Sequence, residues 1–136
     1  MGKKIRLRRL DIPPAGDISG DIEFICRSFG YFSQRDKQGT AGKIFQLLVE
    51  DASNDSDGLT SDEIAERLGL TRGAIVYHLN DFIDAGLVVR EKNLYRLRSS
   101  SLQRSIEEIM RDAQRIFEDM MKIAHDIDEQ FGNFYR

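Results

Sequence analysis

The stretch that decides the fold runs from Leu59 to Arg98 and reads LTSDEIAERLGLTRGAIVYHLNDFIDAGLVVREKNLYRLR. Thr60 followed three residues later by Glu63 forms a capping box, which predicts that a helix begins here. Gly69 predicts the end of this short helix, because glycine adopts the left-handed conformation of a helix terminus at little cost. The residues expected to face the core are Ile64, Ala65 and Leu68.

A second helix is predicted from about Arg72 to Ala85, with Thr71 as its cap and Gly86 at its end. Two short strands, 87–90 and 94–98, are expected to follow, joined by residues 91–93. The order of helix, glycine-containing turn, helix and hairpin is that of a winged helix-turn-helix, whose second helix enters the major groove of DNA. The apolar face of the second helix consists of Ile75, Leu79, Phe82 and Ile83.

The opposite face of this second helix is polar, which no protein core requires. Arg72 lies at the helix N-terminus, where free backbone amides favour phosphate, and it can also reach the acceptor edge of guanine. Gly73 is small enough to let the helix backbone approach DNA. Tyr77 and Asn80 recur on this face at helical spacing, and asparagine can pair with adenine. The hairpin carries basic residues that a wing would place on phosphates, namely Arg90, Lys92 and Arg96.

Residues 101–131 are predicted to form one long helix with an apolar heptad seam. At 1.5 Å per residue it spans about 45 Å, so it cannot bury this face against its own domain alone. The seam is expected to face a second copy and consists of Leu102, Ile106, Ile109, Ala113, Ile116, Met120, Ile123 and Ile127. A second apolar row, expected to pack on residues 18–32, consists of Met110, Phe117, Ala124 and Phe131.

The N-terminal part of the chain is harder to interpret. Residues 1–16 are basic and interrupted by prolines; they are expected to be a solvated tail, an arm on DNA, or a segment packed on a partner chain. A helix is predicted over 18–32, then a polar loop, a helix from the cap Thr40 to about Glu50, and an acidic loop over 51–58. Cys26 is expected to be a small buried hydrophobe. The stripe of the first helix consists of Ile18, Ile22, Ile25, Phe29 and Phe32.

Composition bounds the class of protein. The chain has 136 residues, a net charge of −3, a single cysteine and 40% hydrophobic residues. These values predict a soluble, cytoplasmic, helix-rich domain without an intrachain disulfide or a membrane span. Residues 50–66 carry only acidic charges and residues 1–10 only basic ones, so local rather than total charge should govern DNA binding. We expect no enzyme, metal or cofactor, because no nucleophilic arrangement, phosphate loop or metal-ligand spacing is present.

The segment TRGAIVYHLNDFIDAGLVVREKNLYRLR resembles the recognition helix and wing of ArsR/MarR-like winged helix-turn-helix regulators, in particular their archaeal branch. The likeness covers residues 40–98 closely and the long helix more loosely. It implies a cytoplasmic homodimer that binds operator DNA, often as a repressor. It also implies that Thr71, Arg72, Gly73, Tyr77 and His78 face DNA. Metal-sensing members carry a cysteine pair near the recognition motif; this chain has none, which argues against arsenic or zinc sensing.

The sequence therefore predicts a mainly α fold with a small β-hairpin wing. We expect a basic tail over 1–16, a DNA-binding domain with an extra N-terminal helix over 17–98, and a dimerisation helix over 99–136. His78 is expected to contact DNA or to hydrogen-bond within the fold. The complete set of expected DNA contacts is Thr71, Arg72, Gly73, Val76, Tyr77, His78, Asn80, Arg90, Lys92 and Arg96.

The expected partner is double-stranded DNA with two half-sites about 34 Å apart on a pseudo-palindrome. Two alternatives remain. A winged helix can instead be a protein-interaction module of a transcription or chromatin complex. The chain can also be a regulator that senses a small molecule in a pocket between the long helix and residues 18–32. Core packing explains the residues that would line that pocket equally well; these are Phe24, Phe29, Phe117 and Met120.

Overall fold

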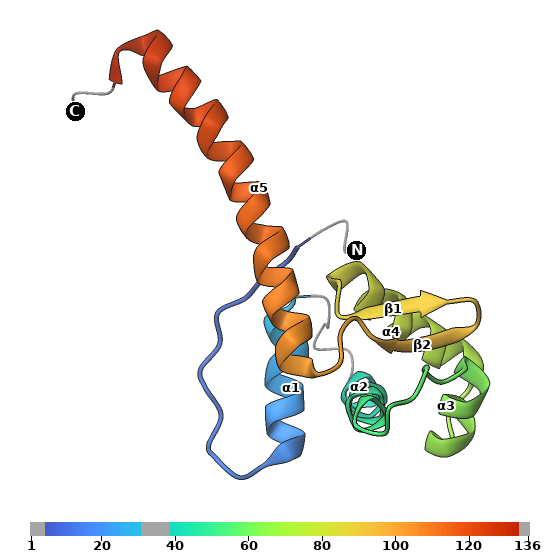
Figure 1. Cartoon of the computed structure of the whole chain (residues 1–136). Helices are drawn as coiled ribbons and strands as arrows, with labels where there is room; N and C mark the ends of the chain where they lie inside the picture. The colour runs from blue at the N-terminus through green and yellow to red at the C-terminus, as the bar shows by residue number, and fades with distance from the viewer. Residues whose placement is uncertain (1–4, 31–38, 134–136) are drawn as a thin grey trace.

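The computed structural model describes residues 5–30 and 39–133, and it has the expected winged helix-turn-helix architecture (Figure 1). Four helices and a hairpin form a domain from which one long helix projects. The elements are α1 (Ile18–Ser28), α2 (Thr40–Ala52), α3 (Ser61–Leu68), α4 (Arg72–Ala85), β1 (Val88–Glu91), β2 (Leu94–Leu97) and α5 (Leu102–Phe131). Among these residues, no helix is long and apolar enough to cross a membrane.

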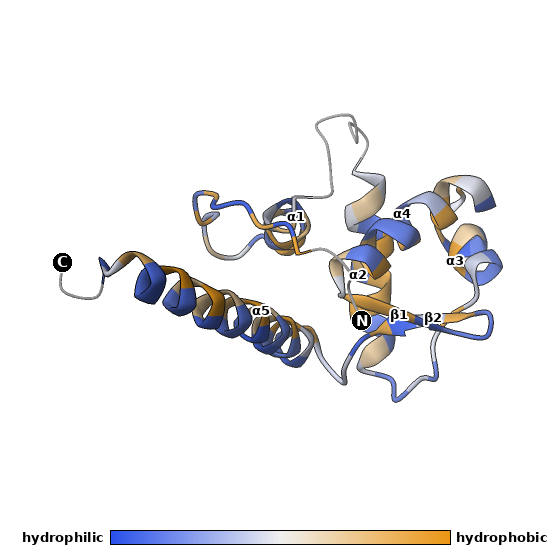
Figure 2. Cartoon of the chain, turned by 90° about the horizontal axis from the view of Figure 1, so that it is seen from above, coloured by the Kyte–Doolittle hydropathy of each residue, from blue (hydrophilic) through white to orange (hydrophobic). Residues whose placement is uncertain are grey.

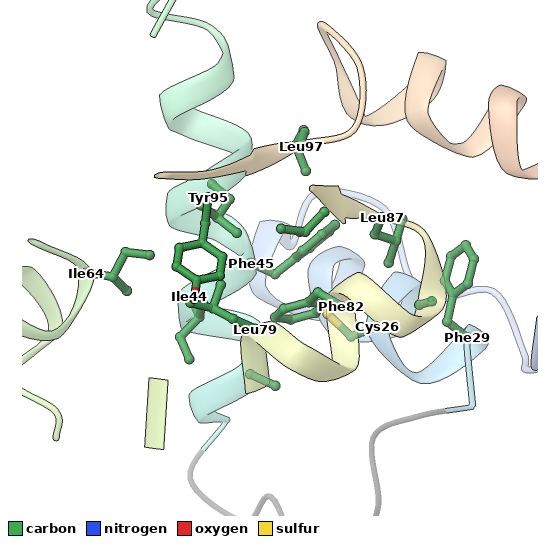
Figure 3. Packing of buried hydrophobic residues seen from close by; sticks show 14 of the residues in the cluster. Cys26, Phe29, Ile44, Phe45, Ile64, Leu79, Phe82, Leu87, Tyr95 and Leu97 are labelled. Atoms are coloured by element: carbon green, nitrogen blue, oxygen red, sulfur yellow. The ribbon is translucent and has the colours of Figure 1, made fainter. Parts of the chain in front are cut away.

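The core of the domain lies between α2, α4 and the hairpin (Figure 3). Phe45 of α2 and Phe82 of α4 stack with their ring centroids 4.9 Å apart, and both are fully buried. Cys26 of α1 joins this core with 3% of its surface exposed, as expected. Removing such apolar side chains from water provides most of the stabilisation of the fold.

The stripe of α1 differs from the expectation at its start, and the helix ends earlier than expected. Ile22, Cys26 and Phe29 are buried, whereas Ile18 is 63% exposed because the first turn of α1 extends beyond the core. The helix ends at Ser28, and the predicted stripe residue Phe32 lies outside the described residues, as does most of the polar loop.

Local signals placed most helix ends correctly. The Thr60 hydroxyl accepts from the Glu63 amide at 3.0 Å, and the Glu63 carboxylate accepts from the Thr60 amide at 3.2 Å, which confirms the capping box. Gly69 and Gly86 end α3 and α4 in the left-handed conformation. The prediction for α2 was wrong at its start and stopped two residues short of its end. Gly39 occupies its cap position, so Thr40 is already helical, and the helix continues through Ala52.

The hairpin is one residue tighter than expected. Glu91 pairs with Leu94, so the connection shrinks from residues 91–93 to Lys92 and Asn93. Leu59 forms an additional bridge to Tyr95, with N···O distances of 2.9 and 2.8 Å, which the sequence did not reveal. Gly58 permits this contact, because a Cβ atom there would lie 2.8 Å from the Tyr95 carbonyl oxygen.

The long helix begins one residue later than expected and contacts the domain only through its first half. Ser101 caps it by accepting from the Arg104 amide at 3.2 Å. Ile109, expected in the dimer seam, is 4% exposed and packs in the core of its own chain, with Leu102 and Ile106 beside it. The prediction that the second row packs on residues 18–32 was wrong, since Met110 and Phe117 remain more than 60% exposed. Beyond them, α5 leaves the domain (Figure 1).

Candidate nucleic-acid interface

The helix-turn-helix holds α4 by one face and leaves the other face free. Ile75, Leu79 and Phe82 are completely buried. The Thr71 hydroxyl accepts from the Ala74 amide at 3.2 Å and so fixes the first turn of α4. Of the predicted contacts on and before α4, Val76 and His78 are half-buried and the others are exposed; these are Thr71, Arg72, Gly73, Tyr77 and Asn80. Five of these seven predicted residues are therefore accessible, and Val76 and His78 are partly covered by the domain.

Arg72 lies at the N-terminus of α4 with a partner that the sequence analysis missed. Its Nε atom is 3.7 Å from an Asp62 carboxylate oxygen, and both side chains are more than 70% exposed. An ion pair this exposed contributes little to stability, so the guanidinium can leave Asp62 for a phosphate or a base at small cost. The acidic first turn of α3 was the signal that could have predicted this pairing.

Gly73 has no structural reason to be glycine. Apart from the neighbouring backbone of α4 itself, no heavy atom of the described residues lies within 4 Å of the position that its Cβ atom would occupy, and its φ angle is not positive. Glycine inside a helix costs roughly 0.5–1 kcal/mol relative to alanine. The absence of a side chain here opens the helix backbone to anything that approaches from outside.

Tyr77 and His78 form an aromatic pair at the edge of the exposed face of α4. Tyr77 is 67% exposed, and its ring lies edge-on to His78 with centroids 5.3 Å apart. The His78 Nδ1 atom is buried and has no hydrogen-bond partner among the described residues. The expectation that His78 hydrogen-bonds within the fold therefore fails for this nitrogen. Burial raises the pKa of the nearby Asp81 carboxyl, and the electrostatic interaction with His78 lowers it to a smaller extent.

The hairpin presents one basic residue at its tip and uses two others to hold its own shape. Lys92 is exposed and adopts a positive φ of 59°. The Arg90 Nε atom donates to the Lys92 carbonyl at 2.8 Å, and its guanidinium lies 5.4 Å from the Tyr95 ring centroid. Arg96 lies 3.7 Å from the Glu91 carboxylate. Lys92 is thus the wing residue best placed to approach a DNA backbone.

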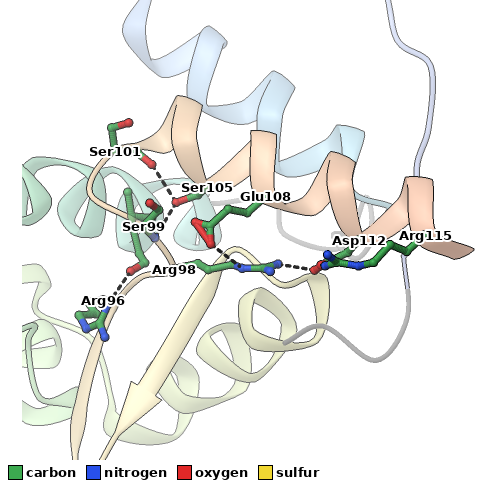
Figure 4. A network of polar contacts seen from close by, with 9 residues as sticks. Arg96, Arg98, Ser99, Ser101, Ser105, Glu108, Asp112 and Arg115 are labelled. Carbon is green, nitrogen blue, oxygen red and sulfur yellow. Dashed lines mark hydrogen bonds and ion pairs between the residues drawn. The ribbon is translucent and has the colours of Figure 1, made fainter.

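A polar network that the sequence did not predict connects the wing to α5 (Figure 4). Arg98, directly after β2, donates to Asp112 at 2.6 Å and lies 3.4 Å from a Glu108 oxygen. Arg115 bonds to the other Asp112 oxygen. The hydrogen bond from Arg98 is the main reason why the pKa of the Asp112 carboxyl lies below its usual value, and the same contact raises the pKa of Arg98.

The serines at the start of α5 complete this connection. The Ser99 amide donates to the Ser105 hydroxyl at 3.0 Å, and that hydroxyl donates to the Ser101 carbonyl at 2.8 Å. Ser105 and Asp112 are both largely buried and lie two turns apart on one side of the apolar seam. Polar residues at two such positions on an amphipathic helix were the available signal for a fixed contact.

Other candidate sites are weaker. The predicted effector pocket is only partly formed: Phe29 and Phe117 line a groove beside α5, but Phe24 and Met120 do not. Within residues 5–30 and 39–133, one group of potential metal ligands lies close together, at the exposed end of α5; it consists of His125, Asp126 and Glu129. Exposed acidic groups of this kind are common without a metal.

Comparison with known proteins agrees with the geometry over the central part of the chain. Residues 46–94, from α2 to the start of β2, match the family model described as MarR family. No curated protein and no solved structure gives a significant match. The matched span contains the whole helix-turn-helix and the wing tip, and it supports a MarR-like winged helix. The finer likeness to ArsR proteins and to an archaeal branch stays a prediction.

Proposed function

We propose that this protein is a transcriptional regulator, which binds double-stranded DNA sequence-specifically as a homodimer and represses from an operator. The observation that carries the proposal is the free face of α4. Arg72, Tyr77 and Asn80 are exposed on it, while the opposite face is fully buried. The match to the MarR family over residues 46–94 supports the same function. Such a regulator would work in the cytoplasm, where operator DNA is accessible.

The α4 face and the wing would have separate roles. Arg72 and Asn80 have the donors that read base edges in the major groove, and the α4 N-terminus favours phosphate. Lys92 would contact the DNA backbone beside the groove and fix the orientation of the domain. Contacts of the second kind add affinity without sequence preference.

The homodimer would come from α5. Its seam positions beyond the domain are about half exposed or more, which a helix in a monomer rarely tolerates; they are Ile116, Met120, Ile123 and Ile127. A two-fold dimer would present two α4 helices to a pseudo-palindrome. Arg98, bonded to Asp112, would hold each domain at a fixed angle to α5 and so set the distance between the half-sites.

Replacement of Arg72 by alanine tests the DNA-binding function. We expect a duplex selected from random DNA to bind the variant at least 10-fold more weakly, because one good base or phosphate contact is worth roughly 1–3 kcal/mol. Fluorescence anisotropy over a range of salt concentrations measures both affinity and salt slope. If Arg72 contacts phosphate, the slope falls by about 0.9.

The matched control is Arg104→Ala, which removes an exposed arginine from the first turn of α5. It should leave binding unchanged. Equal affinity of the unaltered chain and the Arg72 variant, or a salt slope near zero in both, would contradict DNA binding through α4. The winged helix would then be better explained as a protein-interaction module.

A further inference from the structure

An apolar groove lies beside the first half of α5, on the side of α1 and the N-terminal arm, residues 5–16. The groove encloses about 530 Å³. The arm forms one wall, because the Arg8 amide donates to the Ser28 carbonyl at 2.7 Å and holds the arm at the end of α1. The groove's apolar lining includes Leu7, Phe29, Ile106, Met110, Ala113 and Phe117. Three of these, Leu7, Met110 and Phe117, are more than 60% exposed, so an apolar occupant would be stabilised here.

The second half of α5, residues 116–131, carries a surface that fits this groove. Figure 2 shows the apolar edge of α5 running along the whole helix on the side of α1, with the polar edge opposite. In the second half this edge has no domain beside it. Its exposed residues include Ile116, Ile123, Ile127 and Phe131, with exposed fractions from 49% to 72%. The groove and the exposed apolar edge therefore belong to the same chain, but the groove lies beside the first half of α5 and the exposed edge belongs to its second half.

We propose that the second half of α5 from a second copy fills this groove, so that the two α5 helices of the dimer run antiparallel. The proposal rests on the homodimer of the proposed function and specifies its geometry. A helix cannot place its own second half in a groove that lies beside its own first half. Two copies related by a two-fold axis across the helix can each fill the groove of the other.

Charge favours this direction over the parallel one. The first half of α5, residues 102–115, carries three basic and three acidic residues. The second half carries Lys122 against five acidic residues, namely Glu118, Asp119, Asp126, Asp128 and Glu129. A parallel pair would place two acidic halves beside each other, which is destabilising. An antiparallel pair places each acidic half beside a balanced one that includes Arg111 at the groove and the 64% exposed side chain of Arg115.

The residues that flank the seam also favour the antiparallel direction. Met110, Phe117 and Phe131 form the apolar row on one flank, and Asp119 and Asp126 lie on the other. Parallel coiled coils pair opposite flanks, which would put the aromatic rings against carboxylates. The antiparallel direction pairs like flanks instead, so apolar residues meet apolar residues. The acidic flank, with Asp119 and Asp126, is then kept away from the apolar row of the partner.

Distances between spin labels test the direction on the full chain. With Cys26→Ala as background, two single-cysteine variants, Gln103→Cys and Glu129→Cys, carry the label at exposed positions near the two ends of α5. These positions are about 39 Å apart along one helix. We expect each variant alone to give a long distance, on the order of 40 Å. An equimolar mixture should add a short distance, below about 20 Å, between position 103 of one copy and position 129 of the other.

A short distance in the Glu129→Cys dimer alone would overturn the antiparallel arrangement while leaving the homodimer and its DNA binding intact. A monomer in sedimentation at the labelling concentration would instead contradict the homodimer itself. The two failures are therefore distinguishable in one set of samples.

A matched pair of variants tests whether the groove itself is filled. Met110→Glu places a charge in the groove, whereas His125→Glu places it on the second half of α5 at a similarly exposed position opposite the seam. We expect the dimer dissociation constant to rise at least 10-fold for the first variant and to change less than 3-fold for the second. Similar effects of both variants, or none of Met110→Glu, would show that the groove holds something else, such as a small apolar molecule.

Discussion

Gly73 is a position where stability and DNA binding are expected to favour different residues. The chain leaves open space where a Cβ atom would lie, and the residue is helical. Alanine at this position loses less conformational freedom on folding than glycine does. No contact with the described residues explains a glycine here, and close approach of the α4 backbone to DNA is the use that its place in α4 suggests.

Gly73→Ala should therefore change stability and binding in opposite directions. We expect the free energy of unfolding to rise by about 0.5–1 kcal/mol, measured by denaturant unfolding. The affinity for operator DNA should fall several-fold in the same preparation, because the added methyl group lies between the helix and the groove floor. Gly42→Ala provides a control in α2, since its Cβ atom would meet only the Ile22 side chain at 3.8 Å. Unchanged DNA affinity in Gly73→Ala would show that the backbone does not approach DNA there.

Residues that act on their own neighbours were predictable from the sequence, and residues that act across the fold were not. Thr60, Thr71 and Gly69 behave as expected because capping depends on residues within one turn. The contact of Arg72 with Asp62 joins two helices, and its geometry depends on how α3 packs on α4. The buried Nδ1 atom of His78 likewise follows from tertiary packing, which periodicity does not encode.

Among the elements, α5 shows most clearly what a hydrophobic pattern can and cannot predict. The heptad seam correctly predicted one helix, found here over Leu102–Phe131. It did not predict how the seam is divided between two surfaces. Ile109 packs in the core of its own chain, whereas Ile116 is 49% exposed. Both positions have the same residue type and heptad phase, so only the place where α5 leaves the domain distinguishes them.

The contact of Arg98 with Asp112 makes the junction of β2 and α5 sensitive to acid. The pKa of Asp112 is lower in the folded protein than in the unfolded chain, so protonation favours unfolding. Its stabilising contribution is complete above the unfolded value near 4 and is lost as the pH falls through the lower folded value. We expect Asp112→Asn to lower the free energy of unfolding by about 2 kcal/mol at pH 7. The free energy of unfolding of this variant should also depend less on pH in the acidic range.

Urea unfolding between pH 2 and pH 7 measures this effect. Asp119→Asn, one heptad further along α5 at an exposed position, is the matched control. It should leave the acid dependence of the free energy of unfolding unchanged. Equal acid sensitivity of the unaltered chain and the Asp112 variant would show that other carboxylates determine how stability falls in acid.

For the whole molecule, the distribution of charge has more meaning than its sum. The net charge of −3 would argue against a DNA-binding protein if it were spread evenly. Asp55 and Asp57 instead lie in the loop before α3, and five acidic residues lie in the second half of α5. The exposed α4 face itself contributes Arg72 and no acidic residue over 71–80. Salt screens acidic residues that lie beyond about 10 Å, whereas Asp62, 3.7 Å from Arg72, acts on this face directly.

Among the proposed properties of the whole molecule, dimerisation is expected to affect DNA binding most. Ile116→Glu combined with Ile123→Glu places two charges in the exposed part of the seam, where the domain core is not disturbed. We expect sedimentation to show a monomer with an unchanged thermal transition of the domain. Binding to a two-half-site operator should weaken by 10²-fold or more, because the second half-site contact no longer gains from the first. Binding to a single half-site should change little.

The same number of new charges outside the seam of α5, in Met121→Glu combined with His125→Glu, should leave both mass and operator affinity nearly unchanged. This control separates loss of the seam from the added negative charge, which alone weakens binding to DNA. A double seam variant that stays dimeric would move the interface away from α5. A monomeric variant that still binds the full operator tightly would mean that one domain reads the site alone, and the angle that Arg98 fixes between wing and α5 would then have no role in recognition.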